Sequence, residues 1–182
     1  MKFEELAAEA HPLAAPYRVT KGAGFELDRC DPADTGPFGP ADKAKAKRLL
    51  QHGVKCLAEL QERLYAQNRW AALLIFQAID AAGKDSAIKH VMSGVNPQGC
   101  QVYSFKKPSG EELDHDFLWR CAKRMPERGR IGIFNRSYYE ETLIVRVHPE
   151  ILQAQNLPAK LVTKRIWRQR FEDIRAYERY LS

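Results

Sequence analysis

Residues 77–90, QAIDAAGKDSAIKH, combine residue types and a spacing that could bind phosphate. They match in part the Walker A pattern G-x-x-x-x-G-K-[ST], in which backbone N–H groups and a lysine hold phosphates. Two positions depart from that pattern, because Ala78 replaces the first glycine and Asp85 replaces the hydroxyl residue. The stretch is therefore either a phosphate-binding loop with two substitutions or an ordinary turn that contains Gly-Lys.

Both substitutions are compatible with a phosphate-binding loop. Ala78 is tolerated if its φ is negative, because only a positive φ demands glycine. The carboxylate of Asp85 can bind Mg²⁺ directly or through water, in place of a hydroxyl group. Asp80 supplies a second oxygen ligand, and Lys84 can reach a terminal phosphate. Two carboxylates beside a phosphate need a divalent cation between them, so the loop predicts bound Mg²⁺.

A second stretch with chemical potential is RIGIFNRSYYEE, residues 130–141. Phosphoryl-transfer proteins with a parallel sheet often place a metal-binding acid at the end of such a strand. Here the strand ends in Asn135, a neutral oxygen ligand, and Arg136 follows at the edge where open α/β sheets bind ligands. Arg136 could stabilise a phosphoryl group during transfer. The alternative is a turn whose arginine forms a surface ion pair.

The elements that must position these residues are short apolar runs that alternate with helical patterns. The runs 71–79, 101–105 and 130–134 predict strands. Residues 85–92 predict a helix directly after the Gly-Lys turn, which would aim backbone N–H groups and the positive end of the helix dipole at one point. Strands that alternate with helices predict an α/β domain with a mostly parallel sheet.

The remaining chain has weaker patterns. Residues 1–39 are rich in proline and predict an extended N-terminal arm, followed by the core at 40–182 and its first helix to about Gln67. Ser109 is a candidate N-cap, with Glu112 three residues later, for a helix that reaches Met125. Residues 143–147 fit either type of element, and Pro158 predicts the start of a long C-terminal helix.

Composition indicates one globular domain with an anionic partner. The chain has 182 residues and a net charge of +6, and no apolar run is long enough to span a membrane. Its four cysteines form no C-x-x-C pair, so we expect free thiols and a cytoplasmic protein. The basic excess suits a nucleotide, a nucleic acid or another phosphate polymer, although a solvated surface would explain it as well. Basic residues are dense in the second half: Lys106, Lys107, Arg120, Lys123, Arg124, Arg128, Arg130, Arg136 and Arg146.

The sequence also resembles a known family. IDAAGKD, HVMSGVNPQGCQV, SFKKPSGEELDHDFLWR and GIFNRSYYEETLIVRVHPEIL are similar to motifs of the polyphosphate kinase 2 family, from about Ala71 to Leu152. The resemblance implies a P-loop kinase-like fold, a three-layer α/β/α arrangement. It also implies Mg²⁺-dependent, reversible transfer of a terminal phosphoryl group from inorganic polyphosphate to AMP, ADP or another nucleoside mono- or diphosphate. The FNRSYYE version of the second motif resembles the subgroup that phosphorylates both mono- and diphosphates.

Roles for individual residues follow from this resemblance. Asp80, Lys84 and Arg136 would be catalytic, and Asp80, Asp85 and Asn135 would hold the metal. We expect polyphosphate and nucleotides as partners in a homo-oligomer, with no nucleic acid and no membrane. The residues expected to bind phosphate are Ala82, Gly83, Lys84, Asp85, Ser86 and Arg136.

The resemblance departs from the family pattern at the C-terminus. Family members continue past the position of Ser182 with another core strand, a basic lid and a closing segment, so we expect a chain truncated before the last strands and lid. Strand 71–79 would then have an unpaired edge. Two other functions stay open: a non-catalytic polyphosphate- or nucleotide-binding remnant, and an ATP-dependent kinase for a small nucleotide.

Overall fold

The computed structural model describes residues 3–182, which divide into two compact units. The first unit extends to Leu60 and includes Met92–Val95, and the second consists of Gln61–Val91 and Asn96–Ser182. Helix α2 (Lys43–Gln67) ends at the residue predicted from the sequence. None of the helices within residues 3–182 has the length and apolar composition that a bilayer crossing requires.

The N-terminal segment differs from the extended arm predicted for residues 1–39. Phe3–Ala14 form helix α1, and short 3-10 helices follow at Ala15–Tyr17 and Leu27–Arg29. Pro12 lies inside α1, near its end. The alanines and glutamates of this stretch are strong helix formers, and acids in the first turn suit the helix dipole. These preferences outweigh the proline, so the prediction of an extended arm was wrong for Phe3–Ala14.

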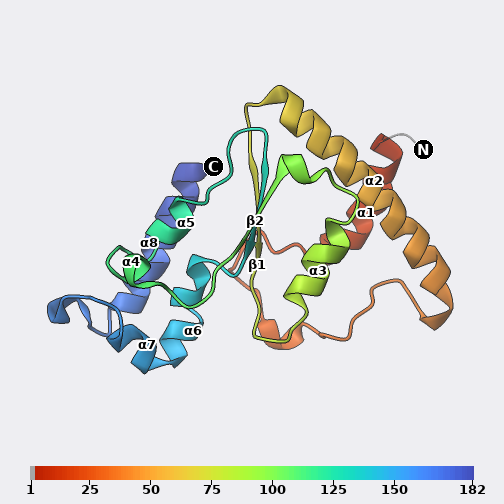
Figure 1. The fold of residues 1–182 in the computed structure, drawn as a ribbon. Helices are drawn as coiled ribbons and strands as arrows, with labels where there is room; N and C mark the ends of the chain where they lie inside the picture. Colours follow the sequence, from red (N-terminus) through yellow and green to blue (C-terminus); the bar gives the residue numbers. More distant parts are fainter. Residues whose placement is uncertain (1–2) are drawn as a thin grey trace. The chain divides into compact units, whose positions relative to one another are not determined.

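The second unit is built around a parallel sheet in the strand order β1-β3-β2. Its strands are β1 (Ala72–Phe76), β2 (Cys100–Ser104) and β3 (Ile131–Asn135). Helix α3 (Lys84–Val91) lies on one side of the sheet, and α5 (Trp119–Ala122) and α8 (Ile166–Leu181) lie on the other (Figure 1). The prediction of an α/β fold with a parallel sheet is confirmed.

Burial differs between the strands as their order requires. All five residues of the central strand β3 are buried, whereas β1 is half-buried throughout. Within the described chain β1 pairs with β3 alone, so its other edge is unpaired, as the sequence predicted.

Aromatic packing fixes the face of the sheet that α5 and α8 cover. Phe134 is fully buried, and the ring of Phe105 meets it edge-on with centroids 4.8 Å apart. Cys121 and Ile174 complete this core from the two helices. Burial raises the pKa of the Cys121 thiol to about 12, so this group stays protonated. All four cysteines are free, as predicted.

The predicted helix from Ser109 to Met125 is wrong in its length. The chain instead forms α4 (Gly110–Leu113) and α5, with a turn between them. Ser109 does cap α4, because its Oγ accepts from the Glu112 N–H and its own N–H donates to the Glu112 carboxylate. The break follows from Asp116, whose carboxylate accepts from the Leu118 N–H at 2.9 Å and so favours a turn over a helix.

The C-terminal region also differs from its prediction. Residues 143–147, of undetermined type, contain helix α6 (Ile144–Val147), and α7 (Pro149–Gln153) follows. Pro158 leads into a short 3-10 helix, and α8 begins only at Ile166. Between this 3-10 helix and α8, the β-branched residues Val162 and Thr163 lower the helix propensity of the chain. The Thr163 hydroxyl also accepts from the Arg165 N–H at 3.3 Å.

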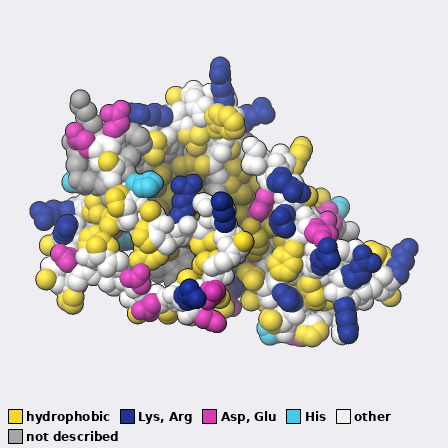
Figure 2. All heavy atoms as spheres, turned by 180° about the vertical axis from the view of Figure 1, so that it is seen from behind, with side chains coloured by type: hydrophobic (Ala, Val, Ile, Leu, Met, Phe, Trp, Pro, Cys, Tyr) yellow, Lys and Arg dark blue, Asp and Glu magenta, His cyan; other side chains and the backbone are white. Residues whose placement is uncertain are grey.

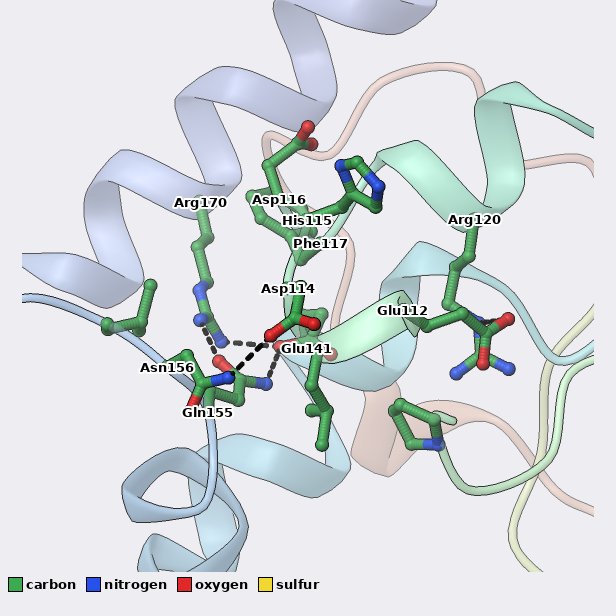
Figure 3. A pocket seen from close by; sticks show the side chains of 13 residues that line it. Glu112, Asp114, His115, Asp116, Phe117, Arg120, Glu141, Gln155, Asn156 and Arg170 are labelled. Atoms are coloured by element: carbon green, nitrogen blue, oxygen red, sulfur yellow. Dashed lines mark hydrogen bonds and ion pairs between the residues drawn. The ribbon is translucent and has the colours of Figure 1, made fainter. Parts of the chain in front are cut away.

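Helix α8 carries a buried cation that ties it to the rest of the unit. Arg170 is 4% exposed. Its guanidinium donates to the Glu141 carboxylate and to the side-chain Oε1 of Gln155, each at 2.6 Å (Figure 3). The Gln155 amide in turn donates to Glu141 at 2.8 Å. The three side chains therefore satisfy one another's hydrogen-bonding groups.

We expect Arg170→Met to lower the free energy of unfolding by about 3–5 kcal/mol, because the Glu141 carboxylate would stay buried without its cation. Urea denaturation followed by circular dichroism measures this loss. Arg168→Met is the matched control on the same helix, since Arg168 pairs with Glu172 in solvent and its removal should change stability by less than about 1 kcal/mol. An equal loss of unfolding free energy in the two variants would contradict a stabilising role of the buried Arg170–Glu141 ion pair.

Candidate functional site

The strand register brings three loops to one edge of the sheet. Phe76 and Ser104 both pair with Asn135, so β1, β2 and β3 end at the same level. The chain segments that follow them surround a cavity of about 640 Å³. Its lining includes most of the predicted site and also residues after β2: Asp80, Ala81, Gly83, Lys84, Asp85, Ser104, Phe105, Lys106, Asn135 and Arg136. Ala82 and Ser86, predicted to bind phosphate, are not among the lining residues.

The loop after β1 is tightly turned. Gly83 and Ala81 have positive φ values of 85° and 62°. Ala78 does not have a positive φ, so the condition under which alanine was expected to be tolerated at this position is met. Lys84 starts α3, and its ammonium donates to the carbonyl oxygens of Ala78 and Ile79, each at 2.8 Å. The lysine therefore lies over the loop, beside the space that a phosphate would enter.

The end of β3 is bound to this loop by side-chain contacts. The Asn135 amide donates to Asp85, and the Arg136 guanidinium forms an ion pair with Asp80. Arg136 has a φ of +65°, and its N–H donates to the Phe76 carbonyl oxygen at 2.9 Å. A non-glycine residue in this conformation persists only where its surroundings hold it, which is common at functional sites.

The donor set allows a magnesium ion that shares its ligands with a substrate. Among the residues that the structure describes, no group of three or more His, Cys, Asp or Glu side chains could hold a metal ion. Mg²⁺ usually keeps several waters and takes one or two carboxylates together with substrate phosphates. Asp80 and Asp85 line the same cavity and provide such a pair.

A second cavity adjoins the first. It has a volume of about 460 Å³ and shares Phe105, Lys106 and Arg136 with the first cavity. Apolar side chains form much of its wall, and Glu140 and Glu141 contribute carboxylates. Cavities of this size and mixed lining suit small organic ligands. Arg136 thus lies where the two spaces meet.

A third cavity, of about 310 Å³, is lined by charged side chains that already have hydrogen-bond or ion-pair partners in the fold (Figure 3). Asp114 accepts from the Asn156 amide at 2.9 Å, and Arg120 lies 3.2 Å from Glu112. His115 stacks on the Trp119 ring with centroids 3.9 Å apart. The acids of this region are therefore engaged in the fold.

Comparison with known proteins identifies the family. The model of the family Polyphosphate kinase 2 (PPK2) matches residues 40–182. The chain belongs to the polyphosphate kinase 2 family. The sequence is 54% identical over 166 residues to the ADP-polyphosphate phosphotransferase of Rhodopseudomonas palustris, and 41% identical over 166 residues to the AMP/ADP-polyphosphate phosphotransferase of Meiothermus ruber. These alignments cover 91% of this chain but only 57% and 58% of the two relatives.

A solved structure supports the same assignment. The fold is similar to the crystal structure of polyphosphate kinase 2 from Arthrobacter aurescens TC1, with a TM-score of 0.77 and 39% identity. That similarity covers 88% of this chain and 54% of the other. The chain thus spans little more than half the length of these family members.

Sequence reasoning missed several residues in or near these cavities. Lys106 lines both main cavities, and its position after a predicted parallel strand was the available signal. Tyr138 and Tyr139 both donate to the Glu178 carboxylate of α8, a contact with no local signal because the partners lie about forty residues apart. Burial, together with Glu178, raises the pKa of both tyrosines, so their hydroxyl groups remain donors.

The basic excess is spread over the surface. On the face shown in Figure 2, many Lys and Arg side chains lie over the part built from α4 to α8, with Asp and Glu between them. The Lys and Arg side chains that line the first cavity are Lys84, Lys106 and Arg136. The net charge of +6 therefore says less about the site than these three positions do.

We expect Gly83→Ala to lower the free energy of unfolding by about 1 kcal/mol, because a Cβ at φ +85° is strained even though it would meet no atom within 4 Å. Gly110→Ala is the control, since its Cβ would also enter open space and its φ lies outside the left-handed region. That variant should be neutral or slightly stabilised. Denaturant midpoints of the two variants test this, and no difference between them would refute it.

Proposed function

We propose that this chain is the phosphoryl-transfer core of a polyphosphate:nucleotide phosphotransferase. The observation that carries the proposal is the convergence of Asp80, Lys84, Asp85 and Arg136 on one cavity that adjoins a second, partly apolar one. The names of the two relatives, ADP-polyphosphate phosphotransferase and AMP/ADP-polyphosphate phosphotransferase, support the same reaction. Inorganic polyphosphate would occupy the first cavity, and the nucleoside mono- or diphosphate the second.

The transfer is an exchange between phosphoanhydrides. An oxygen of the acceptor's terminal phosphate attacks the terminal phosphorus of polyphosphate. The bridging P–O bond breaks, and the donor leaves one unit shorter. Because one anhydride replaces another, the reaction is reversible. Little covalent chemistry falls to the protein, so catalysis comes from positioning and from neutralising charge on the transferred group.

Named side chains would perform these tasks. Lys84 would exchange the carbonyl oxygens of Ala78 and Ile79 for phosphate oxygens of the donor. Arg136, at the junction of the cavities, would contact the group in transfer. Asp80 and Asp85 would hold Mg²⁺, which supplies positive charge to the phosphates, and Asn135 would orient Asp85 through the hydrogen bond between them.

The cellular context is part of the proposal. Four free cysteines are consistent with a reducing compartment such as the cytoplasm. We also propose a homo-oligomer, because α8 exposes the aromatic residues Phe171 and Tyr180, which are 42% and 84% accessible. Light scattering of the purified chain tests the oligomer.

The function is tested by incubating the chain with long-chain polyphosphate, Mg²⁺ and either ADP or AMP, and by measuring the new nucleotide by chromatography. We expect product only when polyphosphate and Mg²⁺ are both present. Binding of polyphosphate without turnover would instead indicate a non-catalytic binding protein. Turnover of AMP with ATP and without polyphosphate would indicate an ATP-dependent nucleotide kinase.

We expect Lys84→Ala to reduce the transfer rate at least about 100-fold, because charge on the phosphates would lose a preorganised partner. Lys89→Ala is the matched control, since Lys89 is an exposed lysine in the last turn of the same helix. Steady-state rates with polyphosphate and ADP measure the effect, and circular dichroism checks the fold. A wild-type rate in the Lys84 variant would remove this residue from the mechanism.

A further inference from the structure

Gln77 connects the two halves of the site. It follows β1 directly and precedes the loop that carries Asp80. Its amide nitrogen donates to the Glu140 carboxylate, and its carbonyl oxygen accepts from the Ser137 hydroxyl at 3.2 Å. Both partners lie about sixty residues away, just after β3. One side chain therefore joins the start of the loop after β1 to the turn that follows Arg136.

The partners of Gln77 are held in turn. Ser137 is 5% exposed, and its Oγ also accepts from the Tyr139 N–H at 3.1 Å, so its hydroxyl group donates and accepts within the turn. Glu140 forms no ion pair within residues 3–182, so the amide of Gln77 holds a carboxylate whose charge is not neutralised. Both Ser137 and Glu140 line the second cavity.

A side-chain amide meets both demands. A glutamine offers an N–H donor and a carbonyl acceptor at the same distance from the backbone. A carboxylate at this position could still accept from Ser137, but it would face Glu140 with like charge. An apolar side chain would leave the Ser137 hydroxyl and the Glu140 carboxylate without this partner, in a partly buried place.

We propose that Gln77 is a positioning residue for phosphoryl transfer. It holds the turn 137–140 against the end of β1, and so fixes Arg136, which precedes this turn and lies between the donor and acceptor cavities. The inference rests on the proposed function. Gln77 does not itself line either cavity, so its effect passes through Arg136 and Glu140.

The test is a reciprocal exchange of the pair. In Gln77→Glu the donor to Glu140 is lost and two carboxylates meet. We expect kcat with ADP to fall at least about ten-fold, while KM for polyphosphate stays within about three-fold because Lys84 and the loop are unchanged. In the double variant Gln77→Glu/Glu140→Gln, the amide introduced at position 140 can donate to the carboxylate introduced at position 77. We expect kcat to recover to at least about a third of the wild-type value.

Two further variants keep the test decisive. Gln98→Glu makes the same change in charge at an exposed residue of the 3-10 helix Pro97–Gly99, and should behave as wild type. Should Gln77→Glu fail to fold, Gln77→Met removes both hydrogen bonds without adding charge, and we expect the same loss of kcat. Thermal unfolding of every variant separates a loss of stability from a loss of kcat, and kcat is compared well below each midpoint.

The outcomes distinguish this inference from the proposed function. Unchanged kcat in Gln77→Glu or Gln77→Met overturns the role of Gln77 while transfer by the wild type stands. A double variant no faster than Gln77→Glu overturns it as well. A wild-type chain without polyphosphate-dependent turnover overturns the proposed function, and the role of Gln77 in transfer with it.

Discussion

The parallel pairing of β1 with β3 is the constraint on which the site depends. Each strand has five paired residues, and the ladder is extended by the Arg136 N–H, which donates to the Phe76 carbonyl oxygen. A shift of one residue would turn every side chain of β1 to the opposite face and move the loop after it. The pairing therefore sets both the burial of the sheet and the distance between Arg136 and the loop after β1.

The parts of this arrangement that depend on local sequence could be predicted. Short apolar runs mark β1 and β3, and the glycine and lysine between β1 and α3 mark the turn, because each signal lies within a few neighbouring residues. The same holds for the Ser109–Glu112 cap. Errors arose where weak local preferences compete, as in the division of one expected helix into α4 and α5 by the Asp116 turn.

Contacts between loops could not be predicted in this way. The Gln77–Glu140 and Tyr139–Glu178 pairs join residues 63 and 39 positions apart, and their geometry exists only after register and helix packing are fixed. The residues around Gln77 and Tyr139 form no local sequence pattern from which their hydrogen-bond partners could be predicted. Most residues proposed to bind a ligand left a signal in the sequence, whereas Gln77, proposed to position them, left none.

The polar groups of the candidate site are paired with one another in a way that would couple the two ligands of the proposed function. Asp80 holds Arg136, and because the Asp80 side chain is 83% exposed this ion pair is screened by water and weak. In the proposed function, a phosphate that bound Arg136 would compete with Asp80 for the guanidinium, and a cation that bound Asp80 would compete with Arg136 for the carboxylate. Either ligand would then free the partner that the other needs, so the binding of each would strengthen the other by the same factor. The weak pair would keep the two loops together until phosphate and metal bind as one complex.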